Sequence, residues 1–191
     1  MRKKKTLSAA AAALTALAAM GVAAPAPASA AAVKIEIVPA HSGSVWEDFE
    51  ASFTCPTNMV LTGRSHYGDE GGRTTYYCSF ILIEGEQARV YMSDWTRPQK
   101  ENRSDFSAPD HQAVVGRWHE GDENGDTKYR TATMSWRGKQ VLLANGDISV
   151  PYKESGHIWQ AVGNTVMTGR KHTGDENGTT YYRFATVTVT G

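Results

Sequence analysis

The sequence lacks the features that mark several large classes of protein. Only two of its 191 residues are cysteines, too few for a disulfide-rich scaffold, and their spacing is not the C-x-x-C of metal and redox sites. After about residue 30 there is no apolar run long enough to cross a bilayer and no long helical periodicity. The G-x-S-x-G, H-E-x-x-H and cysteine–histidine signatures of common hydrolases are also missing. We therefore expect a protein that is not an enzyme, although a glycosidase carboxylate pair, which has no compulsory local motif, stays open.

The first 32 residues have the composition of a secretory signal peptide. A basic start (RKKK) is followed by an Ala/Leu-rich stretch and then by the small residues APAPASA, which suit a signal peptidase. A membrane anchor is the alternative, but the apolar stretch is short and rich in alanine for a span. The segment predicts export, with cleavage near Ala30 to Ala32 and no membrane span in the mature protein.

Removal of this segment changes the charge balance. Its four basic residues leave 16 of the 20 Lys and Arg residues against 20 Asp and Glu, a net charge of −4 with neutral histidines. A mildly acidic chain gives no reason to expect a nucleic acid as partner. About 160 residues suffice for one domain with one core. In an oxidising exterior, Cys55 and Cys78 are expected to form one disulfide that staples the first hairpin.

The sequence of the mature chain contains three copies of one repeat. The decapeptides GRSHYGDEGG, GRWHEGDENG and GRKHTGDENG begin at Gly63, Gly116 and Gly169, a constant spacing of 53 residues. The same spacing divides the chain into residues 33–85, 86–138 and 139–191. Such a fixed period predicts an architecture built from equivalent units. The likeness concentrates in the pattern G-R-x-H-x-G-D-E-x-G-x-T-x-Y, while the flanking residues differ.

The residue pattern around each repeated block is that of an all-β protein. Strands are expected at 33–38, 88–92 and 140–144, and again at 49–53, 104–108 and 157–162. Each block joins two further strands, so that the motif lies at a hairpin tip. Phe53, Phe106 and Trp159 share one repeat position, as expected of a core aromatic. We predict a single closed, pseudo-threefold β domain that is β-prism-like, with a β-trefoil as the alternative.

Alternation along the strands predicts which side chains share a face. Thr62, Arg64 and His66 fall on one face of the first strand, and Tyr76 faces them from the returning strand. With Asp, Glu and Asn at the tip, each hairpin would present donors and acceptors suited to sugar hydroxyls. The candidate ligand-binding residues are Arg64, His66, Asp69, Glu70, Tyr76, Arg117, His119, Asp122, Glu123, Asn124, Tyr129, Arg170, His172, Asp175, Glu176, Asn177 and Tyr182.

Other interpretations of the block remain open at this stage. Asp and Gly are common turn residues, and Arg64 would then simply pair with Asp69 or Glu70 across its hairpin. The carboxylates and amide of GDENG would also suit calcium, although the spacing of an EF-hand is absent. A zinc site would need the three histidines to converge on the threefold axis. No other cofactor is indicated. Trp118 is interpreted as a packing residue on the core side, with sugar stacking as the alternative.

With its export signal, its period and its triplicated tip, the chain resembles small secreted actinobacterial lectins built from three tandem copies. The Ala-rich signal after RKKK is similar in style to those of streptomycetes. The chain lacks the Q-x-W of ricin-type trefoils and the Q-x-D-x-N-x-V-x-Y of monocot-type prisms. The resemblance implies a secreted, non-enzymatic protein that binds glycans or cell-surface carbohydrate through three equivalent sites. The rival hypothesis is an extracellular interaction module, such as an inhibitor or toxin component.

Overall fold

The structure is a computed structural model that describes residues 32–190, apart from Glu70, Glu123 and Glu176. The predicted signal peptide and Gly191 lie outside the described residues. The described part consists of antiparallel β-strands, and its only helical segment is one turn of 3-10 helix, η1 (Glu101–Arg103). No helix of this part has the length and apolar character that a membrane crossing requires. The all-β prediction is therefore confirmed.

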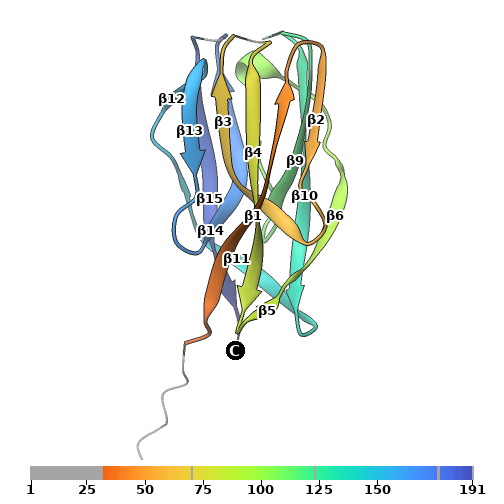
Figure 1. The fold of residues 1–191 in the computed structure, drawn as a ribbon, viewed down its shortest axis with the longest axis vertical. Coiled ribbons are helices and arrows are strands. Elements are labelled where there is room, and N and C mark those ends of the chain that lie inside the picture. Colours follow the sequence, from red (N-terminus) through yellow and green to blue (C-terminus); the bar gives the residue numbers. More distant parts are fainter. Residues whose placement is uncertain (1–31, 70, 123, 176, 191) are drawn as a thin grey trace, which may run out of the picture. The chain divides into compact units, whose positions relative to one another are not determined.

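The smaller sheet contains five strands and includes the first hairpin (Figure 1). Its order is β1-β4-β3-β13, and β5 pairs with β4. The strands are β1 (Ile35–Trp46), β3 (Met59–Tyr67), β4 (Arg73–Ile83), β5 (Glu86–Gln87) and β13 (Gly156–Gln160). The hairpin β3–β4 is therefore flanked by β1 from the start of the chain and by β13 from far along it.

The larger sheet contains ten strands and includes the other two hairpins. Its main path is β2-β9-β10-β11-β15-β14-β8, with β6 and β7 on β10 and β12 on β15. The strands are β2 (Glu50–Thr54), β6 (Arg89–Trp95), β7 (Gln99–Lys100), β8 (Asp105–Ser107), β9 (Ala113–Glu120), β10 (Asp126–Trp136), β11 (Lys139–Ile148), β12 (Tyr152–Lys153), β14 (Thr165–Thr173) and β15 (Thr179–Val189). All the predicted strands are present.

Strand closure was predicted incorrectly. Within residues 32–190, as far as they are described, the strands form two open sheets and not one closed barrel. The short strands at the outside, such as β5, β7 and β12, pair over only two residues each. Because these edge strands are short, they limit pairing with the edge of another sheet even though neither sheet is closed into a barrel.

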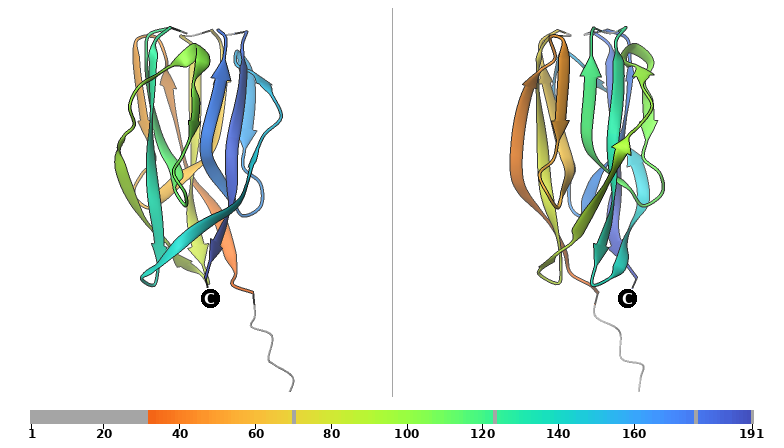
Figure 2. Two further views of the ribbon diagram at one scale, coloured as in Figure 1. Left: turned by 180° about the vertical axis from the view of Figure 1, so that it is seen from behind. Right: turned by 90° about the vertical axis from the view of Figure 1, so that its right-hand side faces the viewer.

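The core lies between the three long hairpins β3–β4, β9–β10 and β14–β15. The tips of these hairpins lie at the same end of the described part (Figures 1 and 2). Each of the inner strands β3, β9 and β14 contacts the other two. Away from the hairpin tips the core is aliphatic, with Val60, Val115 and Val166 among its buried residues. Toward the tips it becomes aromatic and contains Leu61, Val114 and Met167 as well.

The predicted core aromatics occupy this second layer. Phe53, Phe106 and Trp159 each stack on the tyrosine of a hairpin, with ring centroids 4.7, 4.3 and 4.6 Å apart. Phe106 and Trp159 are buried, and Phe53 is half-buried. Offset stacking of this kind adds to the stabilisation that burial of the rings provides. The polar residues of the repeated block lie next to these stacked pairs.

The disulfide Cys55–Cys78 is confirmed, but its role differs from the expected one. Cys55 follows β2 of the larger sheet, and its backbone N–H donates to the carbonyl of Val115 in β9. Cys78 lies in β4 of the smaller sheet. The bond therefore joins the two sheets, because β2 pairs with β9 and not with the first hairpin.

Candidate functional site

The three motif arginines lie inside the protein. Arg64, Arg117 and Arg170 are 0, 3 and 0% exposed, although they come from three different hairpins. The histidines and tyrosines of the motif are buried as well: His66, His119, His172, Tyr76, Tyr129 and Tyr182. The expectation that these side chains are displayed to solvent is wrong. Arg64 and His66 share one face, as the alternation predicts, but this face is the inner one.

Three buried glutamates complete a closed circuit with the arginines, which we call the arginine–glutamate ring. Each glutamate lies between two arginines of different hairpins. The N–O distances are Arg64–Glu154 2.7 Å, Arg64–Glu47 3.6 Å, Arg117–Glu47 2.6 Å, Arg117–Glu101 3.0 Å, Arg170–Glu101 2.5 Å and Arg170–Glu154 3.1 Å. Three cations and three anions alternate, so that the ring as a whole carries no net charge.

The glutamates are positioned by the backbone next to the hairpin tips. The N–H groups of Glu47, Glu101 and Glu154 donate to the carbonyls of Gly72, Gly125 and Gly178 at 3.1, 3.0 and 3.0 Å. Sequence reasoning missed these glutamates. Glu101 and Glu154 are 53 residues apart, but the position 53 residues before Glu101 is Asp48 and not Glu47. The one-residue offset hides the third member from a comparison of the repeats.

Neighbouring arginines fix the charge of each glutamate. Burial raises the pKa of Glu47, but Arg117 and then Arg64 outweigh burial and lower the pKa to about 2. The pKa values of Glu101 and Glu154 lie well below the ordinary value for the same reason. Burial lowers the pKa of Arg64, but the nearby carboxylates more than offset it and raise the pKa. All six groups of the ring are therefore charged at neutral pH.

In the first hairpin, a chain of hydrogen bonds links the R-x-H and T-x-Y parts of the motif. Nη2 of Arg64 donates to Oγ1 of Thr74 at 3.1 Å, and Thr74 lies 2.7 Å from Nδ1 of His66. The other ring nitrogen of His66 lies 3.1 Å from the carbonyl oxygen of Asp69. Since that carbonyl can only accept, His66 carries its proton on Nε2, and its Nδ1 accepts from Thr74. Burial, with help from Arg64, lowers the pKa of His66 and keeps the ring neutral.

Buried tyrosines link neighbouring hairpins through the same arginines. Nη1 of Arg117 donates to the hydroxyl of Tyr76 at 3.3 Å, and Nη1 of Arg64 donates to the hydroxyl of Tyr182 at 3.2 Å. Tyr182 also hydrogen-bonds Nε2 of His157. Burial raises the pKa of Tyr182 to about 12, so that it stays a neutral donor. Two of the motif tyrosines therefore link neighbouring hairpins through buried hydrogen bonds.

The described residues of the hairpin tips have a turn role. Asp122 and Asp175 are exposed, and their Oδ1 atoms accept from the N–H groups of Asn124 and Asn177 at 2.9 Å. Asn124 and Asn177 are exposed as well. Asp69 is exposed, and its carbonyl accepts from the N–H of Gly72 at 2.8 Å. Glu70, Glu123 and Glu176 lie outside the described residues. In the described part no three His, Cys, Asp or Glu side chains are arranged to hold a metal ion.

A second region has the character of a binding surface: the outer face of the five-stranded sheet. Neighbours in register on β1, β4, β3 and β13 point to the same side. Directly paired rows are Trp46–Arg73–Tyr67, Ser44–Thr75–Ser65–Ile158 and Ser42–Tyr77–Gly63–Gln160. Trp46 is 65% exposed, and Tyr67 is 54% exposed. Two exposed aromatic rings therefore stand on either side of Arg73, with hydroxyl groups in the next row.

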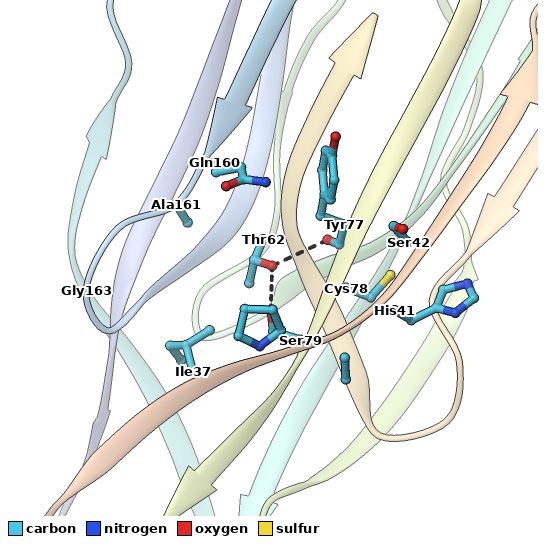
Figure 3. Close-up of a pocket in the computed structure, with 12 residues that line it drawn as sticks. Ile37, His41, Ser42, Thr62, Tyr77, Cys78, Ser79, Gln160, Ala161 and Gly163 are labelled. Carbon is cyan, nitrogen blue, oxygen red and sulfur yellow. Dashed lines mark hydrogen bonds between the residues drawn. The ribbon is translucent and has the colours of Figure 1, made fainter.

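Next to these rows the same face is hollowed into a groove of about 500 Å³, the Tyr77 groove (Figure 3). One wall is β1 from Pro39 to Ser42, and the other is the segment from Gln160 to Gly163. Irregular pairing at Pro39/His41 in β1 and at Leu61/Gly63 in β3 shapes it. The second bulge turns Thr62 away from Arg64 and into the floor, so the predicted common face of the two is wrong. There Oγ1 of Thr62 lies 2.6 Å from Oγ of Ser79.

The outward faces of the other two hairpins carry charge. In the second hairpin Trp118 faces outward, its Nε1 donates to Glu50 at 2.7 Å, and Nζ of Lys128 lies 3.8 Å from its ring centroid. The expected place of Trp118 on the core side is therefore wrong. In the third hairpin Arg183 pairs with Asp105 at 2.8 Å. The pair of exposed aromatic rings thus belongs to the sheet of the first hairpin, whereas the buried motif is common to all three hairpins.

Comparison with protein-family models, with curated proteins and with solved structures found no match to this chain.

Proposed function

We propose that this is an exported, non-enzymatic carbohydrate-binding protein, and that it binds glycans on the outer face of the five-stranded sheet. The observation that carries the proposal is the pair of exposed aromatic rings, Trp46 and Tyr67, beside a row of hydroxyl groups. Aromatic faces stack on the C–H faces of sugar rings, and hydroxyl and amide groups bond sugar hydroxyls. The hairpin tips are no longer part of the proposed site, because the motif's arginines and histidines are buried.

Polar groups on this face are suited to orient a sugar. Oγ of Ser44 lies 2.8 Å from Oγ1 of Thr75 and accepts from Nη2 of Arg73 at 3.2 Å. These contacts hold the two hydroxyls in place in the row next to the aromatic rings. The hydroxyls are carried by the strands of a sheet. Binding therefore costs less free energy for ordering the site than it would if the same groups were on a flexible loop.

We further propose that the described unit consists of three copies of one 53-residue repeat around an axis through the arginine–glutamate ring. In support, the mutual contacts of β3, β9 and β14 and the three aromatic stacks recur at this spacing. Within this arrangement the ring braces the fold, while the outward faces are free to differ. Export is supported by the basic and apolar start of the sequence and by the disulfide.

A glycan array followed by calorimetric titration of the hits tests the binding function. Tyr67→Ala and Trp46→Ala should each weaken binding about fivefold, because each removes a stacking partner worth about 1 kcal/mol. Tyr91→Ala is the matched control: Tyr91 is also 54% exposed but lies on β6 of the other sheet. Silence on a broad array, with capture of a protein from culture supernatant instead, would favour the interaction-module hypothesis.

A further inference from the structure

The lining of the Tyr77 groove defines the charge of what it can hold. Its lining residues are Ile37, Pro39, Ala40, His41, Ser42, Thr62, Tyr77, Cys78, Ser79, Gln160, Ala161 and Gly163, with no Asp, Glu, Lys or Arg among them. Hydroxyls, an amide, the imidazole of His41 and the ring of Tyr77 are the polar and flat groups in this set. A groove with such a lining favours a neutral ligand rich in hydroxyl groups over a carboxylated or sulfated one.

The groove continues the aromatic rows instead of forming a separate site. Tyr77 and Gln160 belong to the third row of the outer face and also line the groove. Figure 3 shows both side chains above Thr62, with Gln160 to the left and Tyr77 to the right. From Trp46 to Pro39 the strand β1 covers about 23 Å at the usual rise per residue. One surface thus runs along the strands from the exposed aromatics into the groove.

The equivalent places in the other copies differ in ways that matter for a ligand. In the third copy a smaller groove of about 300 Å³ is lined by charged side chains, Asp147 and Arg183. In the second copy Trp95 packs beside Gly116, and Oγ of Ser93 lies 3.0 Å from Oγ1 of Thr131. Among the described residues, therefore, the first copy alone has a neutral groove next to exposed aromatics.

We propose that the Tyr77 groove is a second subsite for the same glycan, which makes the ligand a neutral oligosaccharide of several units lying along the strands. This inference rests on the proposed function. One part of the chain stacks on Trp46 and Tyr67, and a further sugar unit enters the groove beside Tyr77. Thr62 is 7% exposed, and its hydroxyl donates to the carbonyl of Tyr77 and pairs with Ser79. Its remaining acceptor position can bond a hydroxyl of that unit. Linking two contacts in one ligand raises affinity beyond that of either.

Calorimetric titration with cello-, malto- and manno-oligosaccharides of one to six units tests this, with oligogalacturonates as the anionic counterparts. For a neutral series that binds, affinity should rise about tenfold or more once the chain reaches both subsites. Because Arg73 stands between the two aromatic rings, the groove is judged by the gain in affinity with chain length, and this gain should be smaller for the anionic chains. Equal affinity for all lengths, or a larger gain with length for the anionic chains, would overturn the inference.

Two variants distinguish the contribution of the groove to binding from that of the aromatic rows. Ser42→Trp places a large ring at the wall of the groove, and Gln160→Ala removes the side-chain amide from the opposite wall. Each variant should abolish most of the gain in affinity with chain length. Ile148→Trp is the matched control, because Ile148 occupies the position of Ser42 in the third copy. If Tyr67→Ala weakens binding while both groove variants bind like the unchanged protein, the binding function stands and the groove inference fails. If no glycan binds, both fail.

Discussion

Nη1 of Arg117 lies 2.6 Å from Oε1 of Glu47, and both side chains are buried although the residues are 70 positions apart. Arg117 also reaches Glu101, so it connects a turn after β1 with the helical turn η1. Removing two charges from water costs several kcal/mol per ion, which the attraction between them offsets only when every partner is in place. In the closed ring each carboxylate has two arginines, so the loss of one arginine leaves two buried carboxylates with one cation each.

Removal of one arginine from the ring should therefore destabilise the protein strongly. Arg117→Met leaves Glu47 and Glu101 buried with one arginine each, and we expect a loss of about 3–5 kcal/mol in the free energy of unfolding. Denaturation in urea measures it. Arg137→Met is the control, since Arg137 pairs with Glu86 at the surface and should contribute little. A loss no larger than that of the control would show that the ring does not brace the fold.

Stability should fall as the solution becomes acidic, beginning with the histidines. Burial, and after it Arg64 or Arg170, lowers the pKa of His157 and of His172 from 6.5 to about 4. Between these values the unfolded chain binds protons that the folded protein does not bind. The stability that the neutral histidines contribute is therefore present above pH 6.5 and is lost as the pH falls to about 4. The expected loss is about 3 kcal/mol per histidine.

The ring carboxylates extend this loss to lower pH. Because the pKa of Glu47 is about 2, its contribution is present above pH 4.5 and disappears as the pH falls to about 2.

Urea denaturation at pH 7, 5.5 and 4 measures the slope. His172→Gln keeps a donor for the carbonyl of Gly174 but cannot be protonated, so it should flatten the slope between pH 6.5 and 4. An unchanged slope in this variant would contradict the assignment.

Two glycines provide a matched test of the tip geometry. A Cβ on Gly125 would lie 1.9 Å from the carbonyl oxygen of Glu120, whereas a Cβ on Gly156 would meet nothing within 4 Å. Gly125→Ala must therefore displace the backbone next to Glu101 and should lower the free energy of unfolding by more than about 1 kcal/mol. Gly156→Ala should change it little. Equal melting temperatures for the two variants would show that the close approach is not needed.

The sequence was sufficient to predict the all-β class and several local features. The 53-residue spacing, the strands, the disulfide and the aromatic position of Phe53 all follow from local patterns. The burial of Arg64 could not be predicted, because charged residues are rarely buried unless they are paired and the partner glutamates come from distant segments. Their position is set by tertiary contacts that no local pattern reports.

The proposed binding face was missed for a different reason. Sequence reasoning searched for function in the residues that all three copies share, whereas Trp46, Tyr67 and Tyr77 are specific to the first copy. Their grouping depends on the register of β1 and β3 on either side of β4. The bulge at Thr62 has no clear sequence signal either, and it moves this residue from the inner face to the groove.

Substitution of the tip aspartates separates a site at the hairpin tips from one on the sheet. In the combined variant Asp122→Ala and Asp175→Ala, each tip loses the acceptor for the N–H of Asn124 or Asn177. We expect about 1 kcal/mol less stability per tip and unchanged glycan affinity, because neither residue is on the outer face of the five-stranded sheet. Asp122→Asn with Asp175→Asn, which keeps the acceptor oxygens, should leave both quantities unchanged. A stepwise loss of affinity with an unchanged melting temperature would instead place the ligand at the tips, since exposed carboxylates would then be contacting it directly.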